Sequence, residues 1–175
     1  MIRTIIESNE VLYPGEDVVL ITNTDLKELK RLALLNPRQR VRLCSHRSPN
    51  DQLHEMFIVH THECYVRPHK HIGKVESMAV LSGEVDVVLF YEDGTIRKVV
   101  RMGDMSSGKV FYYRLSDPIY HMLLIKTDFL VFHEVTQGPF IREQSVFPEW
   151  ALTENDPGIK GFIQMVKSWI DDYSN

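Results

Sequence analysis

Three side chains of one short segment have types and spacing that suit metal binding. Pro68 is followed by His69 and, two residues later, by His71. Alternate residues of an extended chain point to the same side, so both imidazoles share one face. Glu76 follows at the start of the next β-rich run and can add a carboxylate. The spacing therefore predicts a metal site that includes His69, His71 and Glu76.

A glycine extends this pattern to His69-x-His71-x4-Glu76-x6-Gly83. The pattern resembles the first conserved motif of the cupin superfamily at all four positions. Gly83 is expected to make the turn into the following strand.

A second stretch resembles the second cupin motif in part, through Gly103, Pro118 and His121. It departs from that motif because no glycine lies between Pro118 and His121, and because Ile125 stands near the usual asparagine position. The resemblance implies that His121 is the fourth metal ligand, with a hydrogen-bonded core histidine as the alternative.

Longer segments resemble the WbuC family of cupin-fold metalloproteins. They are residues 44–46, 53–56, 65–71, 106–113, 133–140 and 147–150. The resemblance implies a mainly β, single-domain cupin with an RmlC-like jelly-roll β-barrel, and a homodimer. The family is associated with bacterial surface-polysaccharide gene clusters, which implies a sugar, a sugar nucleotide or a related small molecule as ligand.

Three imidazoles and one carboxylate suit one divalent transition metal, namely Fe, Mn, Ni, Cu or Zn. Six-coordination would leave two positions for water or substrate. Three functions fit such a site. They are a sugar isomerase or epimerase, which is the leading hypothesis, an Fe(II)-dependent dioxygenase, and a non-catalytic module that binds a sugar or regulates a pathway.

Five more residues are candidates for roles beside the metal. His133 and Tyr113 are candidate catalytic residues for proton transfer, with structural roles as the alternatives. Arg67 shares strand parity with His69 and can bind an anionic group, or it can form an ion pair at the rim. Lys109 and His54 are candidates for substrate binding because they are polar residues of the family-like segments.

Strands dominate the middle of the chain, where short β-rich runs alternate with turn signals. The runs are 56–59, 64–67, 75–81, 85–91, 96–102, 110–115, 119–125 and 129–135. Apolar spacing predicts a helix over about 24–35 and an amphipathic helix after Pro157. We expect one structural domain with an N-terminal strand/helix segment (1–37), a cupin β-barrel (38–148) and a C-terminal loop and helix (149–175) that packs on the barrel or on a dimer partner.

Composition excludes several function classes. The 175 residues carry a net charge of −4, which gives no general attraction to nucleic acid. No apolar run has the length of a membrane span, and the first ten residues lack a signal-peptide pattern. The two cysteines, Cys44 and Cys64, are expected to be reduced core residues. We therefore expect a cytoplasmic protein without nucleic acid or membrane partners.

Overall fold

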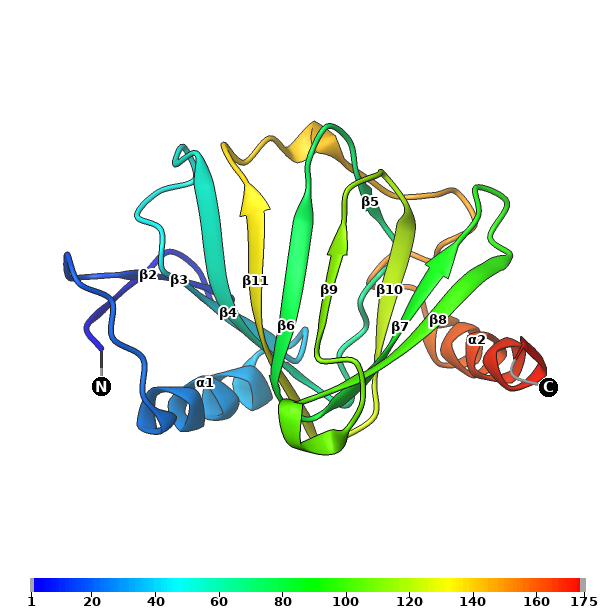
Figure 1. Ribbon diagram of the computed structural model, residues 1–175, viewed down its shortest axis with the longest axis horizontal. Helices are drawn as coiled ribbons and strands as arrows, with labels where there is room; N and C mark the ends of the chain where they lie inside the picture. The colour runs from blue at the N-terminus through cyan, green and yellow to red at the C-terminus, as the bar shows by residue number, and fades with distance from the viewer. Residues whose placement is uncertain (1, 174–175) are drawn as a thin grey trace.

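The computed structural model describes residues 2–173, in which two β-sheets face each other (Figure 1). The larger sheet has seven strands in the order β1 (Thr4–Ile6), β2 (Val11–Pro14), β3 (Arg40–Cys44), β4 (Leu53–Thr61), β11 (Phe129–Gln137), β6 (Glu76–Ser82) and β9 (Tyr112–Leu115). The smaller has the order β10 (Tyr120–Ile125), β7 (Glu84–Phe90) and β8 (Ile96–Gly103). Two short strands, β5 (Lys70–His71) and β12 (Ser145–Val146), pair separately.

The space between the two sheets holds the main hydrophobic core. Met56, Met78 and Phe132 of the large sheet pack there with Val87 and Leu123 of the small sheet. Because strand side chains alternate between faces, these residues identify the inner face of each strand. The next residues along each strand lie on the outer face.

Helix α1 (Asn23–Leu35) covers part of the outer face of the large sheet. Thr22 caps its first turn and forms a capping box with Asp25, whose pKa is lowered to about 2 mainly by the hydrogen bond from the Thr22 hydroxyl. Leu29 and Ala33 of the helix pack with Val59 of β4 and with other buried residues of β3 and β11. Burial of each of the larger side chains, such as Leu29 and Val59, contributes about 1.5–3 kcal/mol to the free energy of folding.

Helix α2 (Ile159–Tyr173) lies at the opposite end of the molecule from α1 (Figure 1). Phe162, Val166 and Ile170 recur on one side of it and pack against Val88 and Met122 of the small sheet. The helix therefore covers the outer face of that sheet within the same chain. Neither this helix nor any other in residues 2–173 is long and apolar enough to cross a membrane.

One predicted strand, 64–67, is absent. Residues 64–68 belong to no strand, although Cys64 and Val66 are buried in the core between the sheets. The alternating apolar residues that predicted a strand are explained by the burial of Cys64 and Val66. Between them, the Tyr65 hydroxyl donates to the Leu152 carbonyl at 3.1 Å. Two short 3₁₀ helices, η1 (Met105–Ser107) and η2 (Arg142–Gln144), complete the described elements.

Candidate metal centre

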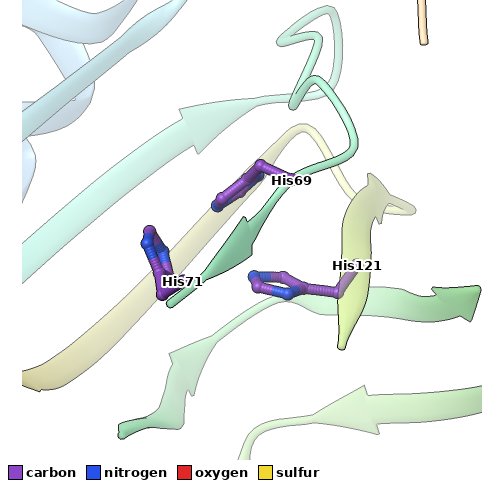
Figure 2. Close-up of side chains that lie close together, drawn as sticks. All are labelled: His69, His71 and His121. Atoms are coloured by element: carbon purple, nitrogen blue, oxygen red, sulfur yellow. The ribbon is translucent and has the colours of Figure 1, made fainter. Parts of the chain in front are cut away.

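Three histidines from two neighbouring segments point toward one another (Figure 2). His69 and His71 lie at β5, and His121 lies in β10. Two backbone hydrogen bonds join the segments, from the His69 amide to the His121 carbonyl at 3.1 Å and from the His121 amide to the His69 carbonyl at 2.9 Å. One potential ligand atom of each histidine lies within 4.8 Å of the other two. The structure thus brings these three predicted ligands together.

Backbone carbonyls fix the protonation of two of the rings. His69 Nδ1 is 2.8 Å from the Arg67 carbonyl, and His121 Nδ1 is 3.0 Å from the Ile119 carbonyl. A carbonyl oxygen only accepts, so each Nδ1 carries the proton. The Nε2 atoms of His69 and His121 then keep their lone pairs for a metal ion.

The third ring is oriented by a side chain. In the other two rings Nδ1 contacts the carbonyl two residues earlier in the chain. For His71 that carbonyl belongs to His69, and it already accepts a hydrogen bond from the His121 amide. His71 Nδ1 instead lies 3.2 Å from the Ser145 hydroxyl of β12. The pairing of Ser145 with His71 in the short β5–β12 ladder sets this contact.

Glu76, the first residue of β6, completes the group. Its carboxylate is buried, with Oε1 3.1 Å from His121 Nε2 and Oε2 3.3 Å from His71 Nε2. Two lone pairs facing each other at 3.1 Å repel unless a proton or a metal ion lies between them. Metal–ligand bonds of about 2.1 Å at right angles would place neighbouring ligand atoms about 3 Å apart. The donor set therefore fits a divalent transition metal.

Burial shifts the pKa values of these groups in opposite directions. It raises the pKa of Glu76 to about 7, although the hydrogen bond from the Tyr113 hydroxyl at 3.3 Å acts against this shift. It lowers the pKa values of His69 and His71 to about 3, with a further contribution from the neighbouring histidines, and it also lowers the pKa of His121. The imidazoles are thus neutral at pH 7, as metal ligands must be.

Two more ionisable residues lie on the inner face beside this group. Tyr113 is opposite Met78 in the β6–β9 pairing, and Glu134 is opposite Met78 in the β6–β11 pairing. Burial followed by repulsion from Glu76 raises the pKa of Glu134 to about 8. Tyr113, a predicted catalytic residue, is therefore beside Glu76, together with Glu134, which sequence reasoning did not select.

His133 lies on the other side of the large sheet. It is opposite Phe57 and Ala79, and its ring centroid is 4.8 Å from that of Phe57. The inner face at this point of β11 is occupied by Phe132 and Glu134 instead. The structure therefore does not bring His133 to the three histidines. Alternation in the sequence could not have selected Glu134, because Val131 and Val135, on the parity of His133, are as apolar as Leu130 and Phe132.

The three predicted substrate-binding residues have other partners in the structure. Arg67 places its guanidinium over the Phe147 ring and donates to the Ala151 carbonyl at 3.1 Å. Lys109 pairs with Glu84 near the turn into β7. His54 is buried on the inner face and stacks on His46 with ring centroids 4.1 Å apart. Of these, His54 shares the inner face with the metal centre, since Thr136 lies between it and Glu76 in the strand pairing.

One family model matches part of the sequence. A family model described as "Domain of unknown function (DUF6016)" matches residues 21–102. No curated protein matches the sequence. The WbuC resemblance is not tested further by these matches and stays a prediction.

Two solved structures are similar at low sequence identity. Protein SO0799 from Shewanella oneidensis is 10% identical with a TM-score of 0.50, over 61% of this chain and 72% of the other. Salicylate 1,2-dioxygenase from Pseudoaminobacter salicylatoxidans, solved with gentisate, is 9% identical with a TM-score of 0.55, over 74% of this chain and 37% of the other. The chain thus spans about a third of the dioxygenase. Since these neighbours are cupin-fold proteins, the chain has a cupin-type fold.

Proposed function

We propose that the chain binds one divalent transition metal through His69, His71, Glu76 and His121 and catalyses proton transfer on a small polar molecule. The observation that carries this proposal is the convergence of His69, His71 and His121 on one point, with the buried Glu76 carboxyl 3.1 Å from His121 Nε2. A bound metal would supply Lewis-acid polarisation of a substrate carbonyl.

Residues on the inner face supply the groups that a proton transfer needs. Glu134 is a carboxyl with a pKa of about 8, raised mainly by burial, so near neutral pH it can both accept and release a proton. The Tyr113 hydroxyl donates to Glu76 at 3.3 Å and holds that carboxylate in place. Both residues lie beside the metal ligands, which favours isomerase or epimerase chemistry among the three functions considered.

The substrate class that we propose is a carbohydrate, such as a sugar or sugar nucleotide of surface-polysaccharide metabolism. The WbuC resemblance supports this choice. The mixed donor and acceptor groups of the inner face, including the half-buried Thr136 and the buried His54, suit a molecule with several hydroxyl groups.

The test uses protein purified without a chelating tag and loaded in turn with Fe(II), Mn(II), Ni(II), Cu(II) or Zn(II). Each form is incubated with a panel of sugars and sugar nucleotides in D₂O, while NMR follows C–H exchange and an electrode follows oxygen. We expect exchange at one carbon without oxygen uptake. Oxygen consumption would instead identify a dioxygenase, and saturable binding without exchange or oxygen uptake a non-catalytic module.

Glu134→Gln separates proton transfer from metal binding. The amide keeps the size of the side chain but cannot act as a base, so we expect exchange to fall by about 10²-fold or more. Metal content should stay at the wild-type level because Glu134 is not among the proposed ligands. Undiminished exchange in this variant would refute the role of Glu134.

Ser145→Ala tests the support of His71 by β12. Loss of the hydroxyl removes the hydrogen bond that orients the His71 ring, and we expect metal affinity to fall by about 10-fold or more. Titration against a competing chelator measures the affinity. Ser145→Thr keeps the hydroxyl and should bind metal nearly as the wild type does. Equal affinities of the alanine variant and the wild type would contradict the assignment.

A further inference from the structure

Arg42 of β3 carries a positive charge on the inner face of the large sheet. It lies opposite Ile58 of β4, which in turn lies opposite Phe132 of β11, and both of these residues pack in the core between the sheets. Arg42 therefore has the parity of the residues that face the metal centre. Sequence reasoning gave an anion-binding role to Arg67, which the structure places against Phe147 instead.

The inner face of β3 is not covered by the small sheet at this position. In Figure 1, β2 and β3 lie on the left, whereas the three strands of the small sheet lie on the right. The neighbours Val41 and Leu43 are buried with helix α1 on the outer face, but Arg42 itself is exposed. Arg42 thus points to the inner side at a place that a solute can reach.

The charge of Arg42 has no counter-ion in the described chain. Arg40, two residues earlier in the same strand, is paired with Glu10 at 2.9 Å and also with Glu154. The Arg42 guanidinium, by contrast, makes no hydrogen bond or ion pair to any group of residues 2–173. Because a guanidinium presents paired N–H donors, an arginine in this position is suited to bind an anion.

A second donor lies beside Arg42. Tyr13 of β2 also packs against the core between the sheets, and β2 runs parallel to β3 with Val11 opposite Arg42. Burial and the neighbouring Cys44 raise the pKa of Tyr13, whereas the positive charge of Arg42 lowers it. Within the part of the chain that the structure describes, the Tyr13 hydroxyl has no hydrogen-bond partner. A phenol and a guanidinium therefore offer their donors side by side.

The charge of Arg42 also acts on a residue next to the metal centre. Burial and then repulsion from Glu76 raise the pKa of Glu134 to about 8, and Arg42 acts against this rise. Glu134 thus lies between the positive charge of Arg42 on one side and the metal ligand Glu76 on the other. The three residues share one continuous inner face.

Strand pairing gives the distance between Arg42 and the metal centre. Val80 of β6 lies on the level of Arg42 across three strand spacings, and Glu76 is four residues away along β6. At about 4.8 Å per strand and about 3.4 Å per residue, the Cα atoms of Arg42 and Glu76 are about 20 Å apart. The arginine side chain and the liganded metal take up part of this distance, which leaves on the order of 10 Å for a ligand that contacts both.

We infer that Arg42 and Tyr13 form a subsite for the phosphate group of a substrate whose reacting carbon lies at the metal centre. This inference rests on the proposed function and narrows its substrate class to phosphorylated sugars, including sugar nucleotides. At about 1.5 Å per C–C bond, the carboxylate of a sugar acid lies too near the other carbons to span such a distance. A phosphate ester extends further, and its oxygens can accept from the guanidinium and the phenol at once.

The test is an NMR titration of ¹⁵N-labelled protein, both loaded with Zn(II) and stripped of metal by a chelator that is then removed. The stripped form excludes binding of phosphate to the metal ion. The probes are inorganic phosphate, glucose 6-phosphate and UDP-glucose, with glucuronate as the carboxylate and glucose as the uncharged sugar. We expect the phosphorylated probes to bind more tightly than glucuronate and glucose in both forms.

Variants assign the binding to the two residues. Arg42→Gln removes a charge-assisted donor pair, so we expect it to weaken binding of the phosphorylated probes by about tenfold or more. Arg42→Lys keeps the charge without the paired donors and should recover part of this loss. Tyr13→Phe should cause a smaller loss. Arg114→Gln, at an exposed arginine on the outer face of β9, is the matched control and should bind the probes as the wild type does.

The outcomes separate the subsite from the proposed reaction. The subsite would be overturned if no phosphorylated probe binds, if Arg42→Gln binds them as the wild type does, or if glucuronate binds through Arg42 as tightly as glucose 6-phosphate. A preference between glucose 6-phosphate and UDP-glucose supports the subsite and identifies the source of the phosphate. None of these measurements needs turnover, so a lack of C–H exchange with Arg42-dependent binding would refute the reaction alone. Thermal unfolding shows whether each variant is folded.

Discussion

Protein with His121→Ala is expected to retain less than about a hundredth of the wild-type affinity for a divalent transition metal. The substitution removes one of four proposed ligands, and losses of about 10–100-fold already follow from disturbing groups that merely support a ligand. It also removes the ring whose Nε2 faces Glu76 at 3.1 Å. Elemental analysis of protein purified without a chelating tag, followed by titration against a competing chelator, measures the change.

His133→Ala is the matched control for this variant. It also removes an imidazole from a strand, but from the outer face of β11. We expect its metal content to equal that of the wild type. Full metal occupancy of His121→Ala would show that water or another residue takes the fourth position and that the cupin-like second motif misled the ligand assignment.

Gly83→Ala is expected to destabilise the fold by about 2–5 kcal/mol. Gly83 has φ +91°, a conformation that costs a residue with a Cβ about 1–2 kcal/mol. An added Cβ would also lie 2.2 Å from the Phe129 carbonyl oxygen and 2.6 Å from Thr127 Oγ1, and such overpacking costs about 1–3 kcal/mol. Urea unfolding followed by circular dichroism gives the free energy of unfolding for both proteins.

Gly108→Ala separates the two contributions. Gly108 has φ +71°, but a Cβ there would meet nothing within 4 Å. We expect a loss of about 1–2 kcal/mol, from the backbone conformation alone. Equal losses in the two variants would contradict the steric part of the Gly83 prediction.

Spacing within one segment of the sequence was enough to place His69 and His71 together in the candidate metal centre. His69 and His71 share a face because alternate residues of an extended segment do, and Gly83 has the positive φ of the tight turn expected between two strands. His121 could be placed beside them only through resemblance to a family motif, because strand alternation within β10 does not show which strand lies opposite. The backbone bonds between His69 and His121 supply that information.

Contacts between distant segments account for what the sequence did not reveal. Ser145 is 74 residues from His71, and nothing in its surroundings marks it as a partner of a metal ligand. Arg67 has the parity expected of a residue that faces the cavity, yet its guanidinium packs on Phe147. Such pairings depend on how the segment after β11 returns across β5, which periodicity within either segment cannot predict.

The choice between His133 and Glu134 shows how composition can mislead. Residue type favours His133, because histidine is the commoner catalytic base and metal ligand. The faces of β11 are decided instead by Leu130 and Phe132, which are buried between the sheets and place Glu134 on the same side. Because Val131 and Val135 make the other face of β11 equally apolar in sequence, only the packing between the sheets identifies the inner face.

The reciprocal backbone bonds between His69 and His121 have a consequence for the order in which a metal ion would be captured. The segments of these two histidines are hydrogen-bonded to each other in the folded chain. Each ring is also oriented by the backbone carbonyl two residues before it. His71 relies on a two-strand ladder with β12, which can open locally at lower free-energy cost than the large sheet. An incoming ion would therefore meet the preformed pair of His69 and His121 nitrogens first, and local opening of the β5–β12 ladder would set the rate at which the ion escapes.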